Sequence, residues 1–328
     1  MLPNSLKVNY LVGFFLLLPI IISYGYIFEY SMDVALDRDG YIDIMLYPFQ
    51  GREEPLLHFI SYMLGFLFSN SFFKLFFIQL SFFILFIITI FKFNKPYQLS
   101  GFNKVLIVIL IFLSVFSNML GVQLRIGYAT IIFIFIVFYL NIKPSMKTLP
   151  IFILPCLMHF GLVFAVLSYY LFYVCKINSI TRFVYIVAIT IIVSTVSIKF
   201  LPFILESIGI NAYYFMYLED GIDLGRALPF SVIFFLLFSM LSIFFFSKDY
   251  SENIEFWYGN FGIVLVYIGL FLELYLAFKM LVPVSAFLYI FIINKIQLST
   301  KSNLLMLSIV LLIMPFSFYM LVSQVGLI

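Results

Sequence analysis

Charged side chains are scarce in this chain of 328 residues: Asp, Glu, Lys and Arg make up 10% of it, whereas apolar side chains make up 65%. A soluble domain carries about a quarter charged residues, so this chain has too few to cover a globular surface. This scarcity excludes a soluble enzyme, a nucleic-acid-binding protein and a disordered scaffold. We therefore predict an integral membrane protein.

Cysteine and histidine are also rare, with two of each. Cys156 and Cys175 both lie in apolar runs, which indicates neither a disulfide framework nor a metal-ligand spacing. No HExxH, GxGxxG, Walker or GxSxG motif occurs, so zinc or serine hydrolysis and nucleotide-driven transport have no support. We expect neither a metal nor a cofactor.

Long runs without Asp, Glu, Lys or Arg indicate the membrane spans, since a helix needs about 17–25 mostly apolar residues to cross the hydrocarbon. These runs are continuous rather than alternating, which favours helices over a barrel. They are 8–28, 55–73, 75–91, 105–124, 126–142, 148–175, 183–198, 227–247, 256–272, 280–294 and 302–328. The first run is long and many others follow it, so we do not expect it to be a cleaved signal peptide.

Lysines indicate the orientation, because cytoplasmic loops carry an excess of Lys and Arg. The cytoplasmic residues are then Lys7, Lys92, Lys95, Lys104, Lys143, Lys147, Lys176, Arg182, Lys248, Lys295 and Lys301. This assignment requires 55–91 to cross once, with 55–70 as a short re-entrant or interfacial helix. It also requires 148–175 to enter and leave on one side, as a re-entrant pair or two short spans with His159 near the outer tip.

The predicted fold is an all-α, polytopic membrane helical bundle with about 9–11 spans and short re-entrant or broken helices. It forms a single integral membrane domain over 1–328. Nine full crossings satisfy the lysine assignment and leave the C-terminus outside. The outer loops 29–54 and 204–226 form a cap on the outer face.

The outer face collects twelve of the fifteen acidic residues and four of the five arginines, namely Arg38, Arg52, Arg125 and Arg226. Lysine serves as a point charge, whereas the planar guanidinium group suits bidentate binding of phosphate or carboxylate. These arginines either pair with the outer acids or bind an anionic ligand. Their concentration on one face favours an anionic ligand.

Arg125 lies between two apolar runs at the predicted start of a span. A charge at a membrane-embedded helix end is costly, and helix N-termini bind anions, so Arg125 is either a functional residue or a snorkelling interfacial arginine. His159 follows Pro155 and precedes Gly161, which predicts a broken helix. Its imidazole could bind a phosphate or hydroxyl, move a proton, or satisfy the broken backbone.

Carboxylates and tyrosines accompany these residues in the outer loops. Glu53 and Glu54 precede Pro55, so they either stabilise a helix start or include a general base. Asp39 and Asp43 with Tyr41 form a polar and aromatic strip. A similar strip in the later loop consists of Tyr213, Tyr214, Tyr217, Glu219, Asp220 and Asp223. Such strips either hold sugar rings or belong to the aromatic belt of the membrane interface.

The order of these motifs resembles a family. Asp39-Gly-Tyr41 leads to Glu54-Pro-Leu-Leu, then to Arg125-Ile-Gly-Tyr-Ala129 and Met158-His159-Phe-Gly-Leu-Val-Phe. This resembles the EpsG branch of the Wzy-type polysaccharide polymerases, over roughly 29–175 with a weaker similarity at 273–290. Where that family tends to carry a late arginine, this chain has Lys279-Met-Leu-Val-Pro283, which puts bidentate phosphate binding at that point in doubt.

The resemblance implies an enzyme of the bacterial inner membrane that extends O-antigen or exopolysaccharide chains at the periplasmic face. It would transfer the growing glycan from undecaprenyl pyrophosphate to the non-reducing end of a lipid-linked repeat unit, with a chain-length regulator protein as a further partner. Arg125 would contact the donor pyrophosphate, with Arg52, Arg226 or Lys279 as a second cation. His159 would bind phosphate or the acceptor, and Glu54 or Asp39 would accept the proton or position the attacking sugar.

Three other classes remain as alternatives. An O-antigen ligase would use the same donor with a different acceptor, and the sequence separates it poorly from a polymerase. A lipid-linked glycan flippase or transporter is disfavoured because few ionisable residues lie at mid-span and no half-to-half repeat of broken helices is visible. A structural scaffold explains neither the outer arginines nor the broken segment at His159.

Overall fold

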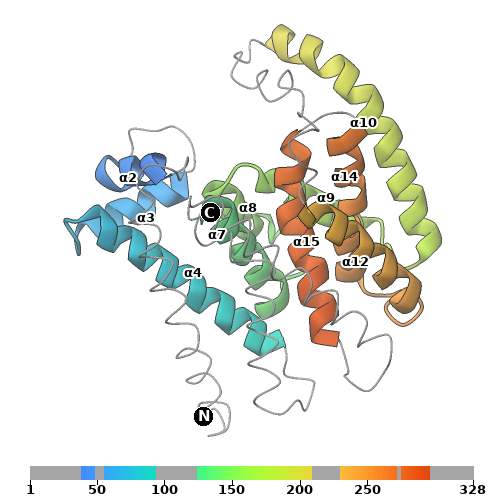
Figure 1. The fold of residues 1–328 in the computed structure, drawn as a ribbon, viewed down its shortest axis with the longest axis horizontal. Coiled ribbons are helices and arrows are strands. Elements are labelled where there is room, and N and C mark those ends of the chain that lie inside the picture. Colours follow the sequence, from blue (N-terminus) through green and yellow to red (C-terminus); the bar gives the residue numbers. More distant parts are fainter. Residues whose placement is uncertain (1–37, 49–54, 94–123, 209–229, 272–274, 296–328) are drawn as a thin grey trace, which may run out of the picture. The chain divides into compact units, whose positions relative to one another are not determined.

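The computed structural model describes residues 38–48, 55–93, 124–208, 230–271 and 275–295, and within these ranges all regular structure is helical (Figure 1). The prediction of an all-α fold is therefore confirmed for the described residues. The helices are α2 (Arg38–Leu46), α3 (Pro55–Gly65), α4 (Ser71–Phe93), α7 (Leu124–Ile134), the π-helical turn η2 (Phe135–Tyr139), α8 (Leu149–Met158), α9 (Leu162–Val174), α10 (Ile180–Ile208), α12 (Phe230–Phe246), α13 (Ile254–Asn260), α14 (Gly262–Phe271) and α15 (Tyr275–Lys295).

The chain divides into two compact units. Unit 1 comprises Met1–Val166 with Ile293–Ile296 and Leu307–Ile328, and unit 2 comprises the remaining residues. Both units are helical where they are described. Part of the first predicted outer loop, 29–54, is the helix α2, and the beginning of the second, 204–226, is the end of α10. The rest of both loops lies outside the described residues.

Unit 1 is built around α4, which packs against α2, α3, α7 and η2. The buried face of α4 follows the helical period, with Leu75, Ile78, Phe82 and Phe86 all nearly inaccessible. In α4, Ser81 shares a 2.9 Å hydrogen bond with Tyr128 of α7, and the helix also packs against η2, which continues α7. Lys74, at the start of α4, and Arg125, at the start of α7, both contact α2, so the two helices run in the same direction.

Helices α7 and α8 form an antiparallel pair. Phe133, near the end of α7, meets Phe152, near the beginning of α8, with ring centroids 6.1 Å apart. The connection between them, 140–148, reverses the chain, and Asn141 there adopts a left-handed conformation with φ 54°. Because α4 runs parallel to α7, Lys92 of α4 lies at the same end of unit 1 as the turn with Lys143 and Lys147. Which side of a membrane this end faces stays a prediction.

The short helix predicted after Pro55 and the break predicted at His159 are both present. Helix α3 ends at Gly65, and a turn separates it from α4. Helix α8 ends at Met158 and α9 begins at Leu162. Lys279, which precedes the predicted span 280–294 in the sequence, already lies within α15, which begins at Tyr275.

Unit 2 has an aromatic core centred on α13. The fully buried ring of Tyr258 lies 5.1 Å from Tyr169, 5.9 Å from Phe172 and 5.0 Å from Phe287, centroid to centroid. Nearby, a polar cluster is satisfied internally. The hydroxyls of Ser239 and Ser242 donate to Asn260 Oδ1 at 2.6 Å and 3.0 Å, and Asn260 Nδ2 donates to the carbonyl of Phe256 at 2.9 Å. Such bonds fix α12 against α13 in an apolar interior.

Two turns of unit 2 carry charged residues and lie at the same end. Phe183, at the start of α10, lies 5.0 Å from Trp257 of α13. This contact brings the turn with Lys176 and Arg182 to the end of unit 2 that also holds the turn with Lys248. Their assignment to the cytoplasmic side stays a prediction.

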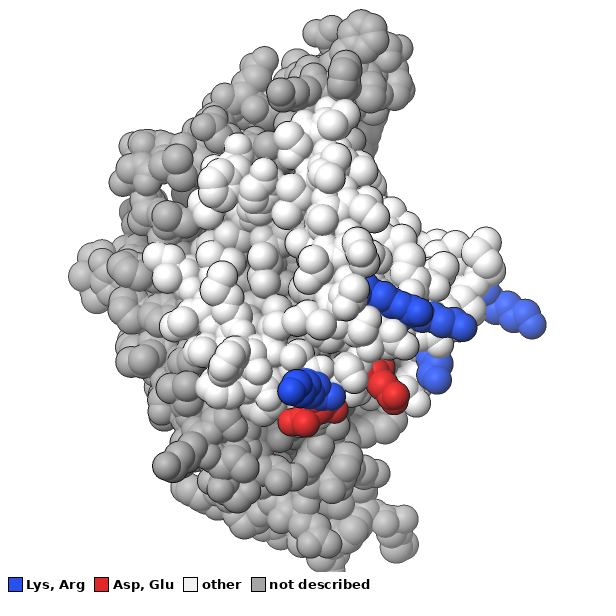
Figure 2. Space-filling view, turned by 90° about the vertical axis from the view of Figure 1, so that its right-hand side faces the viewer, with Lys and Arg blue, Asp and Glu red and all other residues white. Residues whose placement is uncertain are grey.

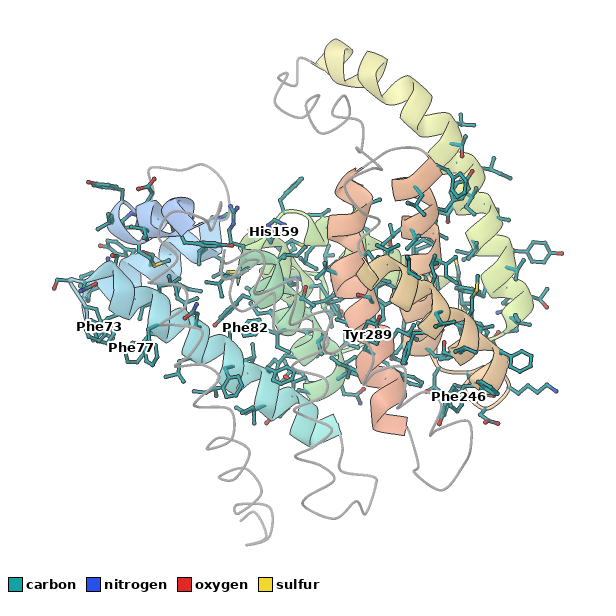
Figure 3. All side chains as sticks on the ribbon, in the orientation of Figure 1. Phe73, Phe77, Phe82, His159, Phe246 and Tyr289 are labelled. Carbon is teal, nitrogen blue, oxygen red and sulfur yellow. The ribbon has the colours of Figure 1, made fainter. Side chains whose placement is uncertain are left out.

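Apolar side chains cover much of the described surface in helical stripes. On α10 the exposed stripe is Val184, Tyr185, Ile189, Ile192, Val193 and Val196, and on α12 it is Ile233, Leu237, Met240 and Phe244. Helix α4 exposes Phe73, Phe77, Ile84 and Ile88, of which Figure 3 labels Phe73 and Phe77. Figure 2 shows one face on which blue and red side chains gather in one region while the rest of the described surface is white.

Length alone supports few membrane spans. Among the described residues, one helical stretch, Ile254–Phe271, is long and apolar enough to cross a membrane, and 61% of its residues are buried. The core helix of a soluble protein can pass the same test. The other apolar helical stretches, such as Phe73–Thr89 within α4 and Ile180–Val196 within α10, have 10–17 residues. The polytopic arrangement therefore stays a prediction.

Gly259 is required where α13 meets α15, because a Cβ at this position would lie 2.7 Å from the backbone of Leu288. We predict that Gly259→Ala lowers the free energy of unfolding by about 1–3 kcal/mol, as overpacking of a core does. Trp257, the single tryptophan of the chain, is fully buried beside this position and reports thermal unfolding by its fluorescence.

Gly40→Ala is the matched control. Gly40 is exposed on α2, and a Cβ there meets nothing within 4 Å. Alanine is also favoured over glycine in a helix by about 0.5–1 kcal/mol. Gly40→Ala should therefore keep or raise the unfolding temperature, and equal temperatures for the two variants would contradict the close packing at Gly259.

Candidate functional site

Arg125 lies in the first described turn of α7, where Tyr41 of α2 holds it by two contacts. The guanidinium carbon lies 5.4 Å from the centroid of the Tyr41 ring, a cation–π geometry. The backbone N–H of Arg125 points to the Tyr41 hydroxyl at 3.4 Å. The first N–H groups of a helix lack partners within the helix, so this bond fits the predicted helix start. The Arg125 side chain is half-buried.

Tyr41 is 2% exposed, so most of its ring lies inside unit 1. We predicted it as part of an aromatic strip that holds a sugar. In the structure its ring lies against Arg125, and its hydroxyl accepts the backbone bond just described. Tyr41 therefore positions the guanidinium group.

His159 ends α8 in an extended conformation, with φ −153° and ψ 118°. Its backbone N–H donates to Pro155 at 3.0 Å, and its carbonyl accepts from the N–H of Leu162, the first residue of α9, at 3.0 Å. The main chain of His159 thus satisfies groups on both sides of the break. Its half-buried imidazole lies against Gly161, where an added Cβ would be 3.1 Å from Nε2.

The antiparallel register brings Arg125 and His159 to the same level of the α7–α8 pair. Phe133 follows Arg125 by eight residues, and Phe152, its contact on α8, precedes His159 by seven. At 1.5 Å of rise per residue, both separations are about 10–12 Å along the helices. Both residues therefore lie at the end of the pair away from the turn 140–148, and Figure 3 labels His159 at this end of α8.

The described residues include only part of the predicted site. Asp39 lies in the first turn of α2, and Lys279 lies in α15 of unit 2. The predicted site residues outside the described ranges are Arg52, Glu54, Tyr213, Tyr214, Tyr217 and Arg226. His58 is 4% exposed and belongs to the buried face of α3. Within the described ranges, no group of three His, Cys, Asp or Glu residues could hold a metal ion.

Sequence reasoning missed two buried residues near this end of unit 1. Lys74 of α4 is 7% exposed, and its Nζ donates to the carbonyl of Met45 at 2.7 Å. Ser61 of α3 is fully buried, and its hydroxyl donates to the carbonyl of Ile44 at 3.0 Å. The sequence could have revealed Lys74, because it is the single Lys, Arg, Asp or Glu between Pro55 and Phe91. Nothing in the sequence distinguishes Ser61 from the other serines.

Comparison with known proteins gives no match: no family model, no curated protein and no solved structure matches this chain. The similarity to the EpsG branch of polysaccharide polymerases therefore depends on the short motifs alone. The geometry at Arg125 and His159 is a separate line of support for a functional site in unit 1.

We predict that Tyr41→Leu makes Arg125 more reactive toward phenylglyoxal, because the guanidinium group loses the ring that holds it. The modification rate should rise about two- to fivefold, which corresponds to the loss of ~0.5–1 kcal/mol of cation–π interaction. Peptide mass spectrometry measures the rate at each arginine. Arg182, exposed in unit 2, is the internal control, and an unchanged rate at Arg125 would show that Tyr41 does not hold it.

Proposed function

We propose that this chain is a polytopic protein of the bacterial inner membrane. The exposed apolar stripes support this proposal, because soluble monomers rarely expose contiguous apolar patches larger than a few hundred Å². Such a stripe runs from Val184 to Val196 on α10 and from Ile233 to Phe244 on α12. A lipid environment removes the cost of this exposure.

We further propose that the protein is a polysaccharide polymerase acting on lipid-linked glycans at the periplasmic face. The observation that carries this proposal is Arg125, held by Tyr41 at the start of α7 and level with His159. A guanidinium group at the positive end of a helix dipole suits a phosphate anion. The motif resemblance supplies the substrate, a glycan on undecaprenyl pyrophosphate.

In this reaction an acceptor hydroxyl attacks the anomeric carbon of the donor sugar. The new glycosidic C–O bond forms as the bond from the anomeric carbon to the pyrophosphate oxygen breaks, and the lipid pyrophosphate leaves with the electron pair. Arg125 stabilises the negative charge that develops on the leaving group, because a preorganised cation acts most strongly where charge appears. The acceptor proton passes to Glu54, Asp39 or His159 as general base.

Arg52, which belongs to unit 1 like Arg125, supplies the second cation for the pyrophosphate in this proposal. The chemistry needs no nucleotide and no metal, because the pyrophosphate is already an activated leaving group.

The topology predicts opposite accessibility for the two ends of unit 1. Ser69 lies in the exposed turn before α4, at the Arg125 end, and Ser145 lies in the exposed turn 140–148. In a chain whose Cys156 and Cys175 are replaced by alanine, an impermeant maleimide added outside should label Ser69→Cys and leave Ser145→Cys unlabelled until the membrane is permeabilised. Labelling of Ser145→Cys from outside would contradict the orientation.

Arg125→Ala should reduce chain extension by about 10²–10³-fold, the effect of removing one preorganised donor from a developing anion. Arg125→Lys keeps the charge without the planar fork and should retain part of the activity. The measurement is the gel ladder of glycan chain lengths from cells in which each variant replaces the natural chain, with the amount of protein in the membrane measured in parallel.

Arg182→Ala is the matched control, since Arg182 is exposed at the opposite, cytoplasmic side in this topology and should leave the ladder unchanged. A natural ladder from Arg125→Ala would remove Arg125 from the mechanism. Purified protein in vesicles with lipid-linked repeat units separates the alternatives: longer products indicate a polymerase, and movement across the membrane without elongation indicates a transporter.

A further inference from the structure

The last turn of α2 is held by two buried side chains from neighbouring helices. The carbonyls of Ile44 and Met45 belong to the final turn of this helix, where backbone oxygens have no partner within the helix. Ser61 of α3 donates to the first at 3.0 Å and Lys74 of α4 donates to the second at 2.7 Å. We call Ser61 and Lys74 the α2 clamp.

Both members of the α2 clamp are buried, which makes each bond costly to remove. A carbonyl left without a donor in an apolar interior destabilises the fold by its full desolvation free energy. Lysine carries donors and no acceptor, so it is suited to the end of a helix where carbonyls are in excess. The Lys74 amino group also lies against the end of α3, since a Cβ on Gly65 would be 3.6 Å from Nζ. The clamp therefore joins the ends of α2 and α3 to the beginning of α4.

The helix that the clamp holds is the one that carries Tyr41. Met45, whose carbonyl Lys74 binds, follows Tyr41 by four residues, so the two lie on the same side of α2, one turn apart. Both side chains are buried. A shift at the end of a helix of nine residues moves all of it, so the position of the Tyr41 ring under Arg125 depends on the clamp.

We propose that Ser61 and Lys74 are positioning residues that fix the guanidinium group of Arg125 through α2 and Tyr41. Neither contacts the reacting atoms in this scheme. Their effect on chain extension rests on the proposed function, whereas their effect on Arg125 itself does not. The two parts can be tested separately for this reason.

The first measurement is the phenylglyoxal modification rate of Arg125 in the purified full-length protein. Lys74→Met keeps the size of the side chain and removes its donors, and Ser61→Ala removes one hydroxyl. Each should raise the rate at least about twofold, as loss of a cation–π contact does. If Lys74→Met does not fold, Ser61→Ala makes the smaller change and carries the test.

Ser242→Ala in unit 2 is the matched control. Ser242 is a fully buried serine whose hydroxyl bonds Asn260 and the carbonyl of Ser239. Its loss should lower the unfolding temperature about as much as Ser61→Ala without changing the rate at Arg125. Equal rate increases in both serine variants would overturn the proposal, because general loosening would then explain them.

A double variant tests the route through Tyr41. If the clamp acts through this ring, Lys74→Met in the Tyr41→Leu background should add no further increase in the rate at Arg125. Additive increases, or unchanged rates in both clamp variants, would overturn the proposal. Failure of the proposed function can be told apart from failure of the clamp proposal. It would appear as a natural glycan ladder from Arg125→Ala, whatever the modification rates of Arg125 are.

Discussion

The contact between the Tyr41 ring and the Arg125 guanidinium group is the interaction on which the candidate site depends. A cation near an apolar interior loses hydration, and an aromatic face replaces part of it. Such a contact uses none of the five N–H donors of arginine, which lie in the plane of the group and can bind an oxyanion at its edge. A carboxylate in the place of Tyr41 would hold the arginine more strongly, but it would occupy those donors. A ring therefore suits an arginine that has to bind a ligand.

The two units use buried polar groups in different ways. In unit 2, Ser239, Ser242 and Asn260 satisfy one another and join neighbouring helices, so these groups stabilise the packing. In unit 1, the buried donors Ser61 and Lys74 bond carbonyls in the last turn of the short helix α2. That helix presents its buried tyrosine to a half-buried arginine. The difference explains why unit 1 is the better candidate for chemistry, although unit 2 has the denser aromatic core.

Local signals could be predicted from the sequence, and contacts between distant segments could not. The break at His159 follows from Pro155 and Gly161, and the helix after Pro55 follows from the proline itself, because both residues act on their own backbone. The start of α7 near Arg125 was also visible. Tyr41 and Arg125 are 84 positions apart, and the clamp joins Ser61 to Ile44 over 17 positions and Lys74 to Met45 over 29. No local pattern encodes such pairs.

The apolar character of the helices explains a second limit of the sequence. Periodicity reveals a buried face when the opposite face is polar, but the exposed faces of α4, α10 and α12 are as apolar as the buried ones. In water this arrangement would be unstable, and in lipid it carries no cost, since the hydrophobic effect does not distinguish lipid from protein interior. Helix association then has to come from close packing and polar bonds. The close approach at Gly259 and the bonds to Asn260 supply both in unit 2.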